Sequence, residues 1–182
     1  MQAQRRDLRA QGQGRGSEKI SAAPRPGFEA KVRPPADAAR WAAALPRPLV
    51  FTNGVFDLLH RGHATYLAQA RELGAALVVA LNSDASARGL GKGDGRPVNA
   101  LEDRMALVAA LGAVDAVTWF EGETPAALIE SLRPDVLVKG GDWPVEKIVG
   151  GKETLARGGR VVSIPFVHQR SSSALLEKLK TK

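Results

Sequence analysis

Five short, mostly apolar runs alternate with helical patterns after residue 48, and this alternation constrains the fold more than any other feature. The runs cover Leu49–Phe51, Ala76–Leu81, Ala116–Phe120, Val136–Lys139 and Val161–Ile164. Runs that are apolar on both faces are typical of strands covered by helices on both sides. Short strand–helix–strand connections pair such strands in parallel, with right-handed crossovers. The sequence therefore predicts an α/β fold: a Rossmann-like, doubly wound parallel sheet of about five strands with helices on both faces.

Four helices are expected around these strands. The first carries an apolar stripe at helical spacing over residues 66–73. The second spans residues 101–111, and the third begins with Thr124 as N-cap and Pro125 as the first helical residue. The last covers residues 171–180 and opens with three serines.

The first 48 residues differ in composition from the rest of the chain. Residues 1–16 are rich in Gln, Arg and Gly without periodicity, so we expect a disordered basic tail. Six prolines in residues 17–48 predict an extended or partly helical lead-in, with a short helix around 37–45 capped by Asp37. Residues 49–182 then form the domain that carries the function.

The distribution of charge and the length of the apolar runs bear on which partners the protein binds and on where in the cell it works. Residues 1–40 hold nine Lys and Arg against four acids, which accounts for five of the seven net positive charges. This region lacks dense basic clusters and interleaved aromatics, so we do not expect nucleic acid as a partner. The longest apolar run, residues 75–81, is too short to cross a bilayer, and no secretory signal is present. The absence of cysteine excludes disulfides, and we expect a cytoplasmic protein with no membrane partner.

Two histidines, His60 and His63, follow the first strand and the turn Asn53–Asp57. Positions three apart share a helix face, and the start of a helix favours an anion. Ligands of parallel sheets bind at the carboxyl ends of the strands, where this motif falls. Two imidazoles directed at a phosphate predict nucleotidyl transfer. Zinc ranks lower, because the chain has one other histidine, His168, and no cysteine.

A glycine-rich loop with one cation follows the second strand. In the segment 91–95, glycine alternates with other residues around Lys92, so the loop can close over a phosphate. It is not a P-loop, because it lacks both the upstream glycine and the hydroxyl residue after the lysine. Arg96 precedes a stiffening proline, and Arg104 lies in the next helix, where arginines are ordinarily solvated.

Two further groups lie at the carboxyl edge of the sheet. Lys139 and Gly140 end a buried strand, and Asp142 can accept a hydrogen bond from an exocyclic amine or a ribose hydroxyl. Trp143 either covers this pocket or packs locally. Three consecutive serines, residues 171–173, open the last helix, although one N-cap residue would be enough to cap it.

The segment Asn53–His63 resembles the signature of the nucleotidyltransferase superfamily that contains glycerol-3-phosphate cytidylyltransferase. Further segments of the superfamily pattern follow in order: Asn82–Asp84, Gly91–Asp94, Arg96–Asn99, Asp103–Arg104, Lys139–Asp142 and Arg170–Ser173. Within the superfamily, residues 49–180 are most similar to the heptose 1-phosphate adenylyltransferases. The serine motif departs from the family pattern by lacking threonine, but it keeps the hydroxyls.

The resemblance implies transfer of AMP from ATP to D-glycero-β-D-manno-heptose 1-phosphate, which gives ADP-heptose and pyrophosphate for lipopolysaccharide core synthesis. It implies His60, His63 and Lys92 as catalytic residues, Arg104 facing the substrate phosphate, and Mg²⁺ arriving with ATP rather than at a protein metal site. The other nucleotide- or substrate-binding candidates are Thr52, Asn53, Gly54, Phe56, Asp57, Gly62, Asn82, Asp84, Arg96, Lys139, Gly140, Asp142, Ser171, Ser172 and Ser173.

Several alternatives stay open at this point. One is a cytidylyltransferase acting on glycerol 3-phosphate or a related alditol or sugar phosphate. The choice between adenine and cytosine depends on backbone groups of the nucleotide pocket, which the sequence alone does not fix. Another is a non-catalytic nucleotide- or nucleic-acid-binding protein, which salt-dependent retention through residues 1–40 would favour. A class I aminoacyl-tRNA synthetase fragment shares the paired histidines, but no tRNA-binding domain is apparent. About 48 residues precede the first strand, too few for a sugar kinase, so a separate kinase would supply the substrate.

Two details are also left undecided. Asp57 either hydrogen-bonds within its turn or orients His60. An exposed flank of the sheet would allow two copies to pair as a homodimer.

Overall fold

The computed structural model describes residues 25–91, 93, 95–141, 143–168 and 172–180. Their strands form one sheet of five, in the order β3-β2-β1-β4-β5, with every pair parallel. The strands are β1 (Leu49–Gly54), β2 (Ala76–Asn82), β3 (Ala116–Phe120), β4 (Val136–Gly140) and β5 (Arg160–Ile164). The predicted Rossmann-like parallel sheet is therefore confirmed.

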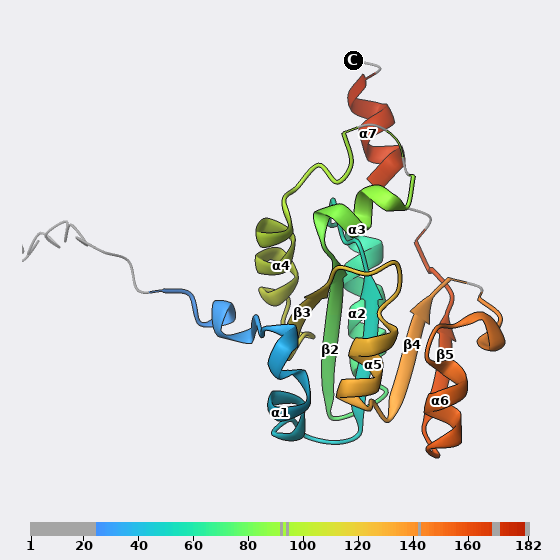
Figure 1. Ribbon diagram of the computed structural model, residues 1–182. Coiled ribbons are helices and arrows are strands. Elements are labelled where there is room, and N and C mark those ends of the chain that lie inside the picture. Colours follow the sequence, from blue (N-terminus) through green and yellow to red (C-terminus); the bar gives the residue numbers. More distant parts are fainter. Residues whose placement is uncertain (1–24, 92, 94, 142, 169–171, 181–182) are drawn as a thin grey trace, which may run out of the picture.

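Helices cover both faces of the sheet (Figure 1). On one face α2 (Arg61–Arg71) and α4 (Leu101–Ala109) pack on Val50, Val79 and their neighbours. On the other face α1 (Ala38–Ala43) and α5 (Ala126–Leu132) pack on Phe51 and Val78, while α6 (Gly151–Ala156) lies against β4 and β5. Because β1 and β2 have a helix layer on each side, both of their faces are apolar and buried. In the described part of the chain, no helix is long and apolar enough to span a bilayer.

Some helix bounds differ from the expectation. The N-cap of α5 is Pro125, whose carbonyl accepts from the Ile129 N–H at 2.9 Å, so the prediction of Thr124 as the cap was wrong. Helix α4 ends at Ala109 instead of residue 111. The six-residue helices α3 (Asp84–Gly89) and α6 were not predicted, since they are too short to show a period.

The lead-in packs against the sheet. Two 3₁₀ turns, Gly27–Lys31 and Pro35–Asp37, precede α1. The Arg33 N–H donates to the Val117 carbonyl at 2.8 Å, so this segment covers part of the β3 edge. Asp37 occupies the N-cap of α1 but makes no capping bond; it pairs with Arg40 at 3.0 Å, which corrects its expected capping role. The tail predicted to be disordered lies outside the described residues, and the homodimer stays a prediction.

The winding of the sheet reverses between β1 and β4. The chain leaves β1 towards β2 on one side and leaves β4 towards β5 on the other, so the winding reverses between these neighbours. Ligands of open α/β sheets bind at such a reversal. Here the Lys139 ammonium at the end of β4 donates to Asn53 Oδ1 at the end of β1, at 3.3 Å.

Candidate active site

The turn after β1 has a conformation that directs the Phe56 ring. Phe56 adopts a left-handed backbone with φ of 49°, which is uncommon for an aromatic residue. Its ring is only 6% exposed and meets the His63 ring edge-on, with centroids 5.2 Å apart. Backbone strain of this kind persists where surrounding packing holds it. The turn thereby provides a buried wall that orients His63.

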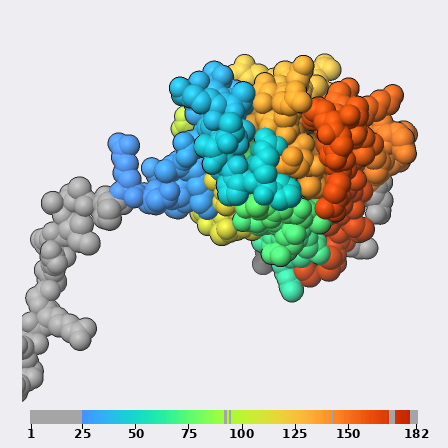
Figure 2. Space-filling view, turned by 90° about the horizontal axis from the view of Figure 1, so that it is seen from below, coloured from blue at the N-terminus to red at the C-terminus, as the bar shows by residue number. Residues whose placement is uncertain are grey.

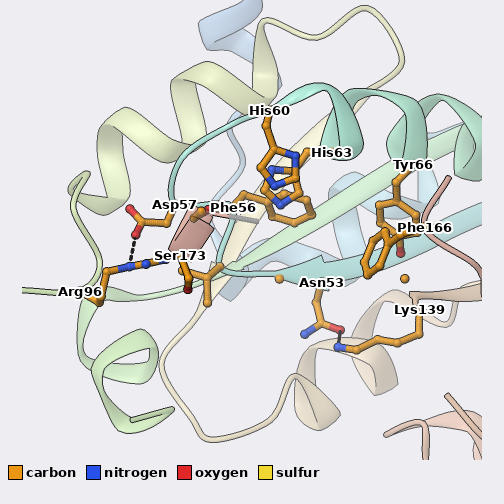
Figure 3. Close-up of a pocket in the computed structure, with 14 residues that line it drawn as sticks. Asn53, Phe56, Asp57, His60, His63, Tyr66, Arg96, Lys139, Phe166 and Ser173 are labelled. Atoms are coloured by element: carbon orange, nitrogen blue, oxygen red, sulfur yellow. Dashed lines mark hydrogen bonds and ion pairs between the residues drawn. The ribbon is translucent and has the colours of Figure 1, made fainter. Parts of the chain in front are cut away.

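His60 and His63 form a stacked pair at the start of α2 (Figure 3). Their ring centroids lie 3.9 Å apart, with the planes 16° from parallel. His60 is the N-cap, and its carbonyl accepts from the His63 N–H at 2.9 Å. A Cβ on Gly62 would lie 3.0 Å from two atoms of the His60 ring, so glycine leaves space for the stack. The structure thus brings the two predicted histidines into one place.

Burial controls the protonation of His60. The pKa of His60 is lowered from its usual value of 6.5, mainly because burial disfavours the imidazolium, and a backbone hydrogen bond opposes this in part. Its Nδ1 is buried and has no hydrogen-bond partner among the described residues. Burial therefore favours the neutral form of the His60 imidazole, and Nδ1 is a buried polar atom without a described protein partner.

A cavity of about 330 Å³ opens beside the histidine pair. It collects most of the residues predicted for the site, together with three that were not predicted. The lining consists of Asn53, Gly54, Val55, Phe56, Asp57, His60, His63, Tyr66, Arg96, Lys139, Gly140, Phe166, Ser172 and Ser173. Cations, imidazoles and hydroxyls thus converge from β1, α2, β4 and α7 (Ser172–Lys180) on one space (Figure 3).

Asp57 holds the segment that follows the glycine-rich loop. Its Oδ1 accepts from the N–H groups of Val98 and Asn99 at 2.8 and 3.1 Å. Its Oδ2 pairs with Arg96 Nε at 2.6 Å, and the Asp57 and Arg96 side chains are 1% and 12% exposed. These side-chain contacts fit neither of the two roles left open: they join Asp57 to the 96–99 segment and anchor Arg96 at the cavity wall, and none of the described contacts reaches His60.

Arg104 is buried away from the cavity. It is 0% exposed and pairs with Asp84 at 2.6 Å. Its other bonds go to three backbone carbonyls, of Val55, Asn82 and Asn99. Arg104 therefore joins the turn after β1 to the ends of β2 and the 96–99 segment. The expectation that Arg104 faces a substrate phosphate is not met in this conformation, because its N–H groups are directed at protein acceptors.

An aromatic pair that the sequence did not reveal flanks the end of β4. Tyr66 and Phe166 meet edge-on, with centroids 5.9 Å apart, and Phe166 is 53% exposed. A Cβ on Gly140 would come within 2.8 Å of the Phe166 ring, so the glycine permits this close approach. The buried Thr52 hydroxyl lies 2.6 Å from the Tyr66 hydroxyl, and thus supports Tyr66 without lining the cavity. Burial also raises the pKa of Tyr66.

A second cavity of about 440 Å³ shares one wall with the first. The shared wall is formed by Asn53, Gly54, Val55 and Lys139. Its other lining residues include Asn82, Glu123, Thr124, Trp143 and Lys147. The two cavities therefore lie on either side of the end of β1, and Lys139 reaches both.

The start of α7 closes the first cavity. The Ser172 hydroxyl donates to the Leu58 carbonyl at 3.2 Å, and the Leu58 N–H lies 3.4 Å from the same hydroxyl. This ties α7 to the turn between β1 and α2, and Ser173 faces the cavity beside it (Figure 3). Three predicted site residues, Lys92, Asp142 and Ser171, lie outside the described residues.

Comparisons with known proteins agree with this geometry. The sequence model of the cytidylyltransferase-like family matches residues 51–173. Over 155 residues the chain is 57% identical to D-beta-D-heptose 1-phosphate adenylyltransferase of Bordetella bronchiseptica, covering 84% of this chain and 96% of that protein. It is 53% identical to the bifunctional protein HldE of Hahella chejuensis over 72% of this chain, but this match spans only 28% of that protein.

A solved structure of a related protein has a similar fold. The lipopolysaccharide core biosynthesis protein from Thermoplasma volcanium GSS1 aligns with a TM-score of 0.54 at 28% identity, covering 67% of this chain and 98% of that one. The family match covers well over half of the chain and includes the histidine pair, the ends of β1 and β4 and the start of α7. The chain belongs to the cytidylyltransferase-like family of nucleotidyltransferases.

Proposed function

We propose that the protein transfers AMP from ATP to D-glycero-β-D-manno-heptose 1-phosphate, giving ADP-heptose and pyrophosphate in the cytoplasm. The observation that carries this proposal is the stacked pair of His60 and His63 in a cavity at the reversal point of the sheet. The likeness to heptose 1-phosphate adenylyltransferase supports the choice of nucleotide and sugar.

ATP occupies the first cavity in this proposal. The Ser172 and Ser173 hydroxyls and the Arg96 guanidinium face the phosphates, where charge-assisted hydrogen bonds are strongest. The half-exposed Phe166 ring supplies a flat apolar surface for the adenine. The buried His60 Nδ1, which has no described hydrogen-bond partner, then donates an N–H to an oxygen of the α-phosphate.

The sugar 1-phosphate occupies the second cavity. Lys139 at the shared wall contacts both substrates, and Lys147 adds a second cation on the acceptor side. Glu123 and Asn82 offer acceptors and donors for the sugar hydroxyls. In this proposal the acceptor phosphate and the triphosphate lie on opposite sides of the end of β1, as an in-line displacement requires.

The reaction is a single displacement. An oxygen of the sugar 1-phosphate forms a bond to the α-phosphorus of ATP, and the bond from this phosphorus to the β-bridging oxygen breaks. Pyrophosphate leaves with the electron pair, so no covalent intermediate with the protein is needed. His60 and His63 stabilise the charge that develops on the α-phosphoryl group, and the cavity supplies positioning.

Mg²⁺ enters with ATP as part of the substrate. Among the described residues, no group of three or more His, Cys, Asp or Glu side chains converges on a metal position. The Asp57 carboxylate, which lines the cavity, is engaged by Arg96 and two backbone N–H groups. These residues do not fit a protein-held ion, whereas Mg²⁺ is commonly carried by substrate phosphates.

A crossed substrate assay tests the proposal. Pyrophosphate release is measured with ATP or CTP, each combined with heptose 1-phosphate or glycerol 3-phosphate. We expect turnover with ATP and heptose 1-phosphate, and far less with the other pairs. Turnover confined to CTP and glycerol 3-phosphate would contradict the proposed substrates while keeping the nucleotidyl transfer.

ATP binding in mildly acidic solution should be coupled to proton uptake by His60. Burial lowers the pKa of His60 below 6.5 in the free protein, and a neighbouring triphosphate raises it again. Between these two pKa values, binding adds a proton; well above both, it adds none. Calorimetric titrations in two buffers of different ionisation enthalpy measure the number of protons taken up on binding. The same titrations of the His60→Asn variant give the contribution of the proton equilibria of ATP, which is subtracted. A buffer dependence that is identical in the variant would contradict the assignment.

Phe166→Ala should raise the KM for ATP about tenfold, because a stacked base loses its platform. The kcat and the thermal stability should change little, since the ring is 53% exposed. Val167→Ala is the matched control, because Val167 is the next residue, is 65% exposed and lines neither cavity. Equal KM values for ATP in the two variants would contradict the assignment of Phe166 to the nucleotide site.

A further inference from the structure

Four arginines surround a third cavity at the opposite end of the sheet from the histidine pair. This cavity has a volume of about 380 Å³ and lies where β1, β4 and β5 begin. The arginines are Arg47, Arg133, Arg157 and Arg160, and the single acidic lining residue is Asp135. Figure 2 views this end, where the segments before β1, β4 and β5 (cyan, orange and red-orange) meet. A five-residue strand spans roughly 16 Å, so this site is separate from the catalytic cavities.

One arginine and the carboxylate neutralise each other within the wall. Arg47 Nη1 pairs with Asp135 Oδ2 at 2.9 Å, and the same oxygen accepts from the Leu49 N–H at 2.6 Å. Arg47 also donates to the carbonyls of Arg133 and Leu132 at the end of α5. Arg47 therefore already supplies the positive charge that the carboxyl end of α5 favours.

The other three guanidinium groups have no carboxylate partner among the described residues. Arg157 donates weakly to the Thr154 hydroxyl, at 3.4 Å, and Arg133, Arg157 and Arg160 are all exposed. Three like charges around one hollow repel one another, and a bound anion relieves that repulsion. Arg47 already pairs with Asp135 and with the end of α5. The cavity therefore keeps three positive charges that no described carboxylate balances.

Two tight backbone segments carry Arg133 and Arg160. Arg133 ends α5 with φ of 46°, a left-handed conformation that glycine or asparagine ordinarily takes. The turn before Arg160 is tight: a Cβ on Gly159 would lie 2.8 Å from Thr154 Cγ2 and 2.9 Å from the Asp135 carbonyl. The Arg160 N–H donates to that same carbonyl at 2.8 Å. The backbone that carries the arginines is therefore defined by local packing and hydrogen bonds.

We infer that this cavity is a second anion site, which binds a small, multiply charged phosphate compound. Guanidinium groups recognise phosphate oxygens in a bidentate manner, and several of them favour a ligand with more than one charge. The cavity has the size of small-molecule sites. The phosphate chain can belong to free pyrophosphate or to a nucleoside triphosphate, since both present the same oxygens.

A ¹H–¹⁵N NMR titration of the full chain with pyrophosphate tests the site. The Gly158 and Gly159 amides report on the arginine cavity, and the Gly54 and Gly140 amides report on the catalytic cavity. We expect saturable shifts at Gly158 and Gly159. Arg160→Gln should weaken this binding about tenfold, as expected for one charged hydrogen-bonding partner, and leave the Gly54 titration unchanged.

Two controls make the result decisive. Arg40→Gln removes the same charge from a side chain that is 82% exposed outside the cavity, so the affinity should not change. Sodium chloride of equal ionic strength should not reproduce the shifts. Shifts that follow ionic strength, or equal affinities in Arg160→Gln and the parent, would overturn the site.

The choice of ligand distinguishes the sources of the phosphate. A parallel titration with ATP that is tighter than pyrophosphate at Gly158, and also weakened by Arg160→Gln, assigns the site to nucleotides. A short single-stranded oligonucleotide that binds there more tightly than either would overturn the small-molecule proposal in favour of nucleic acid. These readouts do not depend on catalysis, so they hold whatever the transferase assay shows.

Discussion

Replacing His63 by alanine is expected to lower the kcat for pyrophosphate release by about 10²–10³-fold, as loss of one group that stabilises a developing charge does. The stacked geometry with His60, at 3.9 Å between centroids, and the Phe56 wall fix where this imidazole points. Since the interaction strengthens in the transition state, the KM for ATP should change much less than the kcat. Stopped assays with the purified variant measure both constants.

The chain offers its own control for this experiment. His168 is the third histidine, and its side chain lines neither catalytic cavity. His168→Ala should therefore retain most of the activity. An unchanged kcat in His63→Ala, or an equal loss in both variants, would contradict the role given to the pair.

Arg104→Leu is expected to lower the free energy of unfolding by about 3–5 kcal/mol, because several acceptors of a buried charged donor lose their hydrogen bonds at once. The guanidinium is 0% exposed, and its removal leaves Asp84 and three backbone carbonyls without this donor. Arg104→Lys keeps the charge but not the fork of donors, so its loss should be smaller. Urea unfolding followed by circular dichroism measures the difference.

An exposed arginine separates this effect from a general loss of charge. Arg88 lies on the exposed surface of α3, and Arg88→Leu should change stability by no more than about 0.5 kcal/mol. If Arg104 instead served as a phosphate ligand, Arg104→Lys would fold with parental stability and show a raised KM. That pattern would overturn the structural role.

The sheet was predictable because its signals are local. Each predicted strand is a short, mostly apolar run, and each of the five observed strands contains its predicted run within its bounds. The histidine pair was also predictable, since three-residue spacing at the start of a helix lies within one turn. Helices α3 and α6 were missed because six residues make fewer than two turns, which is too short to show the helical repeat of apolar residues.

Contacts between distant residues were not predictable in the same way. Asp57 and Arg96 are 39 positions apart in the sequence and meet only because the 96–99 segment returns to the turn after β1. Arg104 did carry a signal: it falls in the apolar stripe of α4, one turn from Leu101 and Val108, where a solvated arginine does not belong. Phe166 follows the last strand without any pattern, so its position over Gly140 required the fold.

The most direct test of the transferase follows the phosphorus atoms of ATP through one turnover. The protein, in excess, is mixed with heptose 1-phosphate and Mg²⁺, and with ATP that is radiolabelled at either the α or the γ position. We predict that the α label appears in a nucleotide sugar and the γ label in pyrophosphate, at equal rates, and that His63→Ala slows both. A γ label in the sugar product, or both labels remaining in ATP while folded protein is present, would contradict transfer of AMP.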